Sequence, residues 1–111
     1  MMKNNSSGAR PIIYNVTIKV ALTIADQWLS WLLDEHIPEV MSTCCFTKYS
    51  VLKLLNTDDE QGITYAVQYN ADSMEDYNYY LNNYANDLRK KSFEKWGDHF
   101  IAFRTLMEVV H

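Results

Sequence analysis

Two stretches of this chain alternate apolar and polar residues, and a helix start follows each of them. The first stretch covers residues 12–20 and the second covers residues 63–70. Alternation with a period of two, built from β-branched and aromatic residues, predicts half-buried β-strands. Thr23 and Ser73 then each stand three residues before an aspartate, which is the spacing of a helix-capping pair. The chain therefore repeats one plan, a strand followed by a helix, in each half.

The complete order of predicted elements is strand, helix, strand, strand, helix, strand. The two remaining strands are residues 46–55, whose Lys48 and Lys53 suit the edge of a sheet, and residues 99–110. This order is that of the ferredoxin-like split βαβ arrangement. We predict an α+β fold, ferredoxin-like βαββαβ, with a four-stranded antiparallel sheet and two helices on one of its faces.

The first helix contains two of the three tryptophans. The residues that share one apolar arc at 100° per residue are Ala25, Trp28, Leu29, Leu32 and His36. Trp31 falls on the flank of this arc, so we expect Trp28 in the core and Trp31 partly exposed. Pro38 lacks an N–H and restricts the residue before it, so the helix should stop or kink near His36.

The second helix is predicted to be long and amphipathic, from Ser73 to Gly97. Its apolar stripe consists of Met74, Tyr77, Leu81, Tyr84 and Leu88. Tyr79 and Tyr80 lie off this stripe and are candidates for a partner surface.

The sheet face opposite the helices is predicted to mix polar and apolar side chains. Such a face is too apolar to lie open in water and too polar for a closed core, so a wet homodimer interface fits it best. The candidate interface residues are Asn15, Thr17, Gln68, Arg104 and Leu106.

Composition limits the class of protein. A chain of 111 residues supports one domain, which we place at residues 12–111, with residues 1–11 as a flexible N-terminal tail. The net charge of -4 argues against a nucleic-acid or membrane partner. The only cysteines, Cys44 and Cys45, are adjacent, a spacing that suits neither an ordinary disulfide nor a metal site. We expect reduced thiols in a cytoplasmic protein with no metal and no cofactor.

Four ordered segments resemble a known protein family. They are residues 12–17 (IIYNVT), 35–40 (EHIPEV), 62–69 (GITYAVQY) and 103–110 (FRTLMEVV). Together they are similar to the small bacterial family called domain of unknown function 4286, from about residue 12 to residue 110. The resemblance implies a ferredoxin-like, dimeric α+β barrel. The family has no assigned activity, so the resemblance supplies no catalytic residue.

Any chemistry is expected around His36, the candidate catalytic residue. It stands on the apolar arc of the first helix, facing strand tyrosines that should point to the helices. The ligand-pocket candidates are Tyr14, Trp28, His36, Tyr65 and Tyr69. An imidazole beside a phenol could move a proton on a small substrate. The structural alternative is that His36 only satisfies the carbonyl of Asp34 that Pro38 leaves without a donor.

Two classes of function stay open at this point. The first is a small-molecule enzyme or binding protein that uses a pocket between helices and sheet. The second is a non-catalytic homodimeric module whose polar groups serve packing and assembly. A cavity beside His36 favours the first class, and a fully packed helix–sheet interface favours the second.

Overall fold

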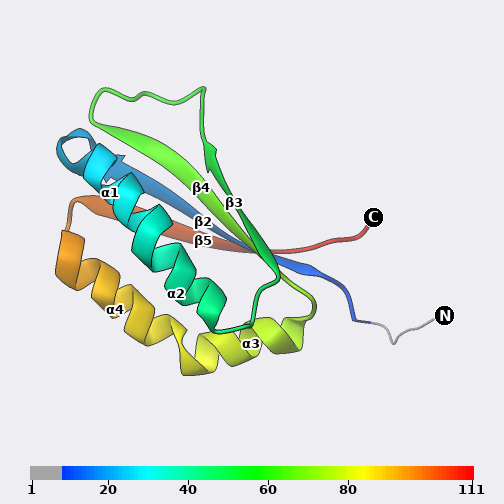
Figure 1. Ribbon diagram of the computed structural model, residues 1–111. Coiled ribbons are helices and arrows are strands. Elements are labelled where there is room, and N and C mark those ends of the chain that lie inside the picture. The colour runs from blue at the N-terminus through cyan, green and yellow to red at the C-terminus, as the bar shows by residue number, and fades with distance from the viewer. Residues whose placement is uncertain (1–8) are drawn as a thin grey trace.

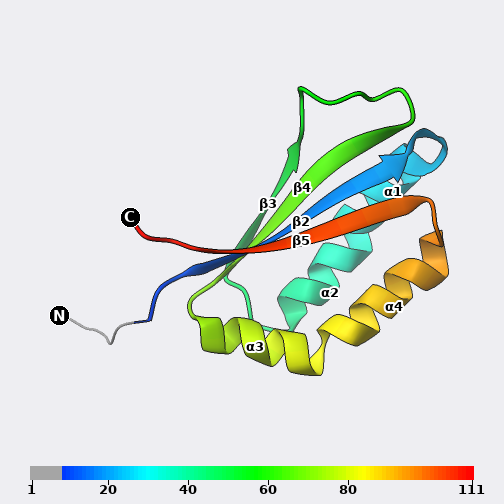
Figure 2. The same cartoon turned by 180° about the vertical axis from the view of Figure 1, so that it is seen from behind.

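The computed structural model describes residues 9–111 and contains a four-stranded antiparallel sheet with helices on one face (Figure 1). The strands lie side by side in the order β3-β4-β2-β5. Seen from behind, the opposite face of the sheet is covered by no helix of residues 9–111 (Figure 2). The elements in chain order are β2 (Ile12–Ala21), η1 (Leu22–Ile24), α1 (Ala25–Trp31), η2 (Leu32–His36), α2 (Ile37–Ser42), β3 (Lys48–Lys53), β4 (Gly62–Ala71), α3 (Met74–Asn83), α4 (Ala85–Trp96) and β5 (Phe100–Glu108). The predicted ferredoxin-like α+β fold is confirmed.

The two alternating stretches form the centre of the sheet. β2 and β4 pair along their whole length, with Tyr14 opposite Tyr69 and Asn15 opposite Gln68. The predicted strand at residues 46–55 is shorter than expected: β3 spans Lys48–Lys53, and Thr47 and Leu54 flank it with backbone hydrogen bonds to β4. It lies at the edge of the sheet, as its lysines indicated.

The first helix does not end at Pro38. Instead, the α-helical turns of α1 continue through the π-helical segment η2 into α2. The N–H of Ile37 donates to the carbonyl of Leu32, five residues back, and this wider turn accommodates the proline that follows. The predicted cap by Thr23 is wrong, because the chain enters α1 through the short turn η1 with no side-chain cap.

The second helix is broken rather than continuous. Tyr84 leaves the helical conformation, so α3 and α4 meet at an angle (Figure 1). The Ser73 cap is confirmed, since its hydroxyl accepts the N–H of Asp76 at 3.2 Å. The break also changes which tyrosine faces the core: Tyr80 is buried, whereas Leu81 and Tyr84 of the predicted stripe are exposed.

The last strand faces the opposite way from the prediction. β5 pairs with β2 so that Arg104 lies opposite Val16 and Leu106 lies opposite Tyr14, on the helical side of the sheet. Both residues were expected on the open face, and that expectation is wrong. Both faces of β5 carry apolar residues, so its own pattern does not determine its phase, and a shift of one residue exchanges the two faces.

The core between helices and sheet is rich in aromatic rings. Trp28 is buried as predicted, and its ring stacks on that of Tyr65. Trp31 is also buried, which corrects the expectation of partial exposure: its ring lies between those of His36 and Trp96.

Residues 1–8 of the predicted tail lie outside the described residues. No helix within residues 9–111 is long and apolar enough to cross a membrane.

Candidate ligand cavity

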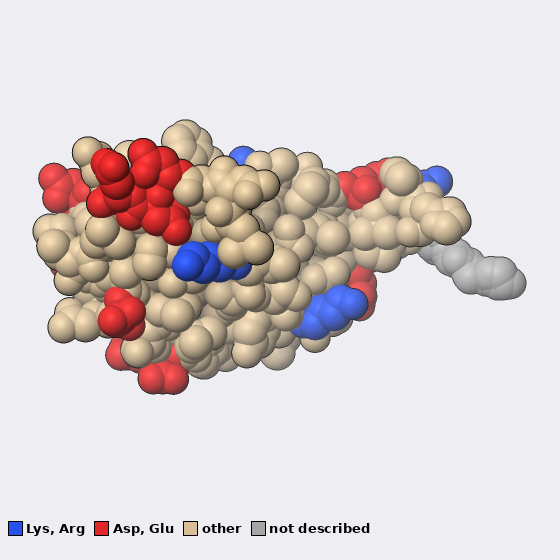
Figure 3. Space-filling model, turned by 90° about the horizontal axis from the view of Figure 1, so that it is seen from above, with Lys and Arg blue, Asp and Glu red and all other residues tan. Residues whose placement is uncertain are grey.

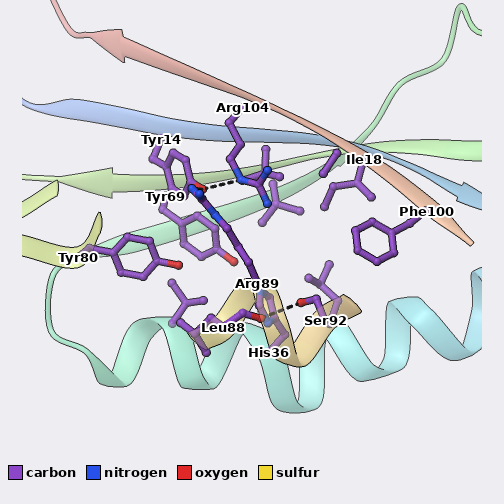
Figure 4. A pocket seen from close by; sticks show the side chains of 15 residues that line it. Tyr14, Ile18, His36, Tyr69, Tyr80, Leu88, Arg89, Ser92, Phe100 and Arg104 are labelled. Carbon is purple, nitrogen blue, oxygen red and sulfur yellow. Dashed lines mark hydrogen bonds between the residues drawn. The ribbon is translucent and has the colours of Figure 1, made fainter. Parts of the chain in front are cut away.

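A cavity of about 70 Å³ lies between the helices and the helical face of the sheet (Figure 4). Strands β2, β4 and β5 contribute one wall, and the helical segments η2, α2, α3 and α4 contribute the other. The polar residues around it are Tyr14, His36, Tyr69, Tyr80, Arg89, Ser92 and Arg104. The apolar residues are Val16, Ile18, Leu32, Val40, Val67, Leu88, Phe100 and Ala102. The interface between helices and sheet is therefore not fully packed beside His36, which is one of the residues that line the cavity.

Two arginines meet at the hydroxyl of Tyr14. The Nη2 atom of Arg89, from α4, and the Nε atom of Arg104, from β5, each donate to this oxygen at 3.1 Å. Figure 4 shows the two side chains approaching Tyr14 from opposite walls of the cavity. Arg89 and Arg104 lie 75 and 90 positions after Tyr14 in the sequence, and the three residues form one hydrogen-bond network.

These two guanidinium groups have no acidic partner within residues 9–111, where the ion pairs involve other cations. Glu39, the acidic residue whose charge acts on His36, is paired with Lys91 at 2.7 Å. Because both donor nitrogens lie 3.1 Å from the same oxygen, the two positive charges are close enough to repel each other. The cavity therefore carries a local excess of positive charge in a protein whose net charge is negative.

His36 reaches the cavity from the π-helical segment. Its ring stacks on Trp31, with ring centroids 4.8 Å apart, and its Nδ1 atom is buried with no hydrogen-bond partner among the described residues. Burial lowers the pKa of His36 from 6.5 to about 4; the charge of Glu39 opposes this shift and that of Arg104 adds to it. The imidazole is therefore neutral at pH 7.

The buried tyrosines of the cavity are neutral hydrogen-bond donors. Burial raises the pKa of Tyr69 above the usual value for a phenol, and nearby Tyr80 and Tyr14 contribute in the same direction. Burial likewise raises the pKa of Tyr80, although the charges of Arg89 and Arg104 lower it. Each phenol therefore keeps its proton across the physiological range and can offer it to an acceptor.

The structure separates the five predicted pocket residues into two groups. Tyr14, His36 and Tyr69 line the cavity together, as expected. Trp28 and Tyr65 do not line it, because they stack on each other with ring centroids 5.6 Å apart. Whether a ligand contacts any of the five stays a prediction.

Sequence reasoning missed Arg89, Arg104 and Tyr80 as cavity residues. Arg89 was interpreted as a basic residue near the C-terminal end of a helix, where it interacts favourably with the helix dipole. Tyr80 was off the predicted apolar stripe. Arg104 was on the wrong face because the phase of β5 was wrong. The sequence held no signal for Arg104, because its face depends on the pairing of Arg104 with Val16, which the pattern of β5 alone does not determine.

The open face of the sheet holds a different set of polar groups. Asn15 is buried there, accepts a hydrogen bond from Gln68 at 3.2 Å and donates one to Thr17 at 2.9 Å. These three predicted interface residues thus lie on the expected face. Beside them, Ile101 and Phe103 of β5 are 59% and 67% exposed.

Surface charge is sparse on the side of the molecule seen from above. Figure 3 shows acidic side chains gathered at one end of that side and only scattered basic ones.

In the part of the chain from residue 9 to residue 111, no group of three or more His, Cys, Asp and Glu side chains could hold a metal ion.

The sequence and the fold were compared with known proteins. The model of a family described as "Domain of unknown function (DUF4286)" matches residues 11–110. No curated protein matches the sequence.

Several solved structures share the fold. A dimeric ferredoxin-like protein from an uncultured marine organism has a TM-score of 0.65, with 11% identity over 92% of this chain and 97% of that chain. A protein named as a candidate antibiotic biosynthesis monooxygenase from Bacillus cereus has a TM-score of 0.62, with 17% identity over 92% of this chain and 95% of that chain. An ethyl tert-butyl ether d (ethd) family protein from Bacillus halodurans has a TM-score of 0.63, with 8% identity over 85% of this chain and 96% of that chain. At such low identity these likenesses show the fold alone.

Proposed function

The chain belongs to the DUF4286 family, and we propose that its function is to bind a small molecule in the cavity between helices and sheet. The observation that carries this proposal is the convergence of polar groups from separate elements on one apolar-walled space. A site with these properties, a concave apolar pocket with a few directed polar groups and a strongly shifted pKa, is typical of ligand-binding sites.

The protonation states favour binding over proton transfer. A general base works best when its pKa is near the operating pH, and the pKa of about 4 makes His36 a weak base. The phenols, whose pKa values are raised, are weak acids for the same reason, burial. His36 serves as a neutral polar anchor in this proposal, because it lines the cavity and its buried Nδ1 has no hydrogen-bond partner within residues 9–111.

Filling the cavity tests the proposal. Ala102 lies on the cavity wall, so Ala102→Leu adds three carbon atoms to that space. We expect the small molecules that bind the wild-type protein in an NMR fragment screen to lose binding to this variant. Ala66→Leu is the matched control, because Ala66 lies on the open face of β4, opposite Thr17. Fragments that bind both variants equally well, or a screen with no binder, would contradict the cavity as the site.

The proposal includes a homodimer formed through the open face of the sheet. Exposed Ile101 and Phe103, next to the Asn15–Gln68 hydrogen bond, support it because large exposed apolar patches are typical of interfaces. The likeness to a solved dimeric protein is a further reason to test it. Arg104 and Leu106 are not part of the proposed interface, since they face the helices.

Light scattering tests the assembly. The wild-type protein should have about twice the chain mass of 13.0 kDa. Phe103→Asp should reduce the mass toward that of one chain, because the aspartate would place a charge in the interface. Phe93→Asp provides the control, since Phe93 is 63% exposed on α4, on the other side of the molecule. A wild-type monomer at micromolar concentration would exclude the dimer.

A further inference from the structure

We infer that the ligand of this cavity is a small organic carboxylate held by the guanidinium groups of Arg89 and Arg104. The inference rests on the proposed function and specifies its ligand class. It depends on three features of the site, namely the kind of hydrogen-bonding groups present, their charge and the walls around them.

Hydrogen-bond donors outnumber acceptors around the cavity. Each guanidinium has five N–H donors, and within residues 9–111 each uses one of them, on Tyr14. Since the Tyr14 oxygen accepts both of these bonds, its own proton has no acceptor in the described part of the chain. Tyr69 and Tyr80 add two more phenol protons. A ligand that satisfies this set must present acceptor atoms to these donors.

The charge of the site has the same consequence. Both donor nitrogens lie 3.1 Å from one oxygen, so the two guanidinium groups are held close together. Neither forms an ion pair between residues 9 and 111, and Glu39 is bound to Lys91. An anion placed between the two arginines would remove their mutual repulsion and gain charge-assisted hydrogen bonds from both. A neutral ligand would do neither.

The walls indicate an organic anion rather than an inorganic one. Aliphatic side chains from both layers line the same cavity as the arginines, among them Val16, Val67 and Leu88. Arg104 is an exposed residue that also lines the cavity, so the charged end of the site reaches the protein surface. A carboxylate at this end leaves its carbon chain against the apolar walls, and a volume of about 70 Å³ limits that chain to a few atoms.

Three probes of nearly equal shape separate charge from size: propionate, propionamide and propionamidinium, which are negative, neutral and positive. Each is titrated into the ¹⁵N-labelled full-length protein while the side-chain Nε–H signals of arginine are followed by NMR. Propionate should shift the signals of Arg89 and Arg104 with saturation. Propionamide should bind at least about tenfold more weakly, because it is neutral and loses the charge-assisted hydrogen bonds to both guanidinium groups. Propionamidinium should not bind.

Matched variants assign the effect to the two arginines. Arg89→Gln and Arg104→Gln should each weaken propionate binding about tenfold or more. Arg10→Gln should leave it unchanged, because Arg10 is an exposed residue that lies 3.9 Å from Glu108 and does not line the cavity. Thermal unfolding of each variant verifies that the fold is retained, and Arg→Lys at either position shows whether the charge alone or the guanidinium shape is recognised.

The outcomes distinguish this inference from the proposed function. Equal binding of propionate and propionamide would overturn the carboxylate inference and leave a small-molecule site in place. Inorganic phosphate that binds as tightly as propionate would overturn it in favour of a general anion site. If none of the probes shifts the Arg89 and Arg104 signals, the inference is also wrong, and the fragment screen on Ala102→Leu then decides on the cavity itself.

Discussion

Two aromatic regions lie between the helices and the sheet, and only one of them encloses a cavity. In the first, Trp28 stacks on Tyr65 and lies beside Trp31, and none of the ring atoms of Trp28 or Tyr65 faces the cavity. In the second, the rings of Tyr14, Tyr69 and Tyr80 also pack on one another, yet their layer encloses a cavity. Both regions are buried, and both bring residues of a central strand against a helix.

The difference lies in the groups that accompany the rings. In the Trp28 region the aromatic rings pack directly on one another, and such packing leaves little empty space. The Tyr14 region must also accommodate an imidazole and the guanidinium groups of two arginines, whose polar atoms do not pack as closely against the rings as other rings do. Aromatic residues alone therefore do not mark a binding site in this protein. The site is marked by polar side chains that converge on the rings from other elements.

The largest expected effect is in the closed region. Trp28→Ala should lower the free energy of unfolding by about 3–5 kcal/mol, the usual range for a large aromatic residue removed from a core. Trp31→Ala should be costly too, because Trp31 is buried between His36 and Trp96. Urea denaturation measures both, with Tyr79→Ala as the control, since Tyr79 is 57% exposed. A loss for Trp28→Ala no larger than that for Tyr79→Ala would show that this region is not tightly packed.

The pH dependence of stability should come from the cavity region. The folded pKa of His36, about 4, is lower than the 6.5 of an unperturbed histidine, so between these values the unfolded chain binds more protons than the folded one. Stability should therefore fall as the pH decreases from about 6.5 to about 4, by at most roughly 3 kcal/mol from this group. Below that window, His36 should cause no further loss.

Urea denaturation at a series of pH values measures this dependence. His36→Gln should reduce the slope between pH 6.5 and 4, and His99→Gln should not, because His99 is an exposed residue outside the cavity. An unchanged slope in His36→Gln would mean that His36 is not buried in its neutral form. The comparison of slopes is independent of any constant loss of stability that the glutamine causes.

The smallest effects should come from single hydroxyl groups. Tyr14→Phe leaves two guanidinium donors without their shared acceptor and should cost about 1–2 kcal/mol. Tyr65→Phe should change stability by less than about 0.5 kcal/mol, because no hydrogen bond holds the Tyr65 hydroxyl within residues 9–111. Thermal or urea unfolding of the two variants gives the comparison. Equal costs would remove the distinction between the two regions.

Prediction of the elements from sequence succeeded where the signal is local. The strands at residues 12–20 and 63–70 have an alternation strong enough to fix both position and face, and β2 and β4 follow it. The Ser73 cap also depends only on neighbouring residues, and it forms. The Thr23 cap has the same spacing and does not form, because the chain leaves β2 through a 3-10 turn that displaces Thr23 from the cap position.

The helix containing Pro38 shows the limit of a local rule. Proline removes one hydrogen bond of an α-helix, and the rule correctly located the irregularity near His36. It did not predict that the helix would continue, because packing of Leu32, Ile37 and Val40 in the core favours a wider turn over an end. The π-helical segment that results is also what carries His36 to the cavity.

By itself, the sequence determined the order of the elements, the ferredoxin-like fold, the face of each central strand and the presence of His36, Tyr14 and Tyr69 on one side of the sheet. These features depend on periodicity and on residues close together in the chain. Only the tertiary structure decided the phase of β5, the break at Tyr84 and the meeting of Arg89 and Arg104 at Tyr14. Each of these depends on pairing between segments far apart in sequence, whose free energy is shared by many contacts and is not encoded in the pattern of either segment alone.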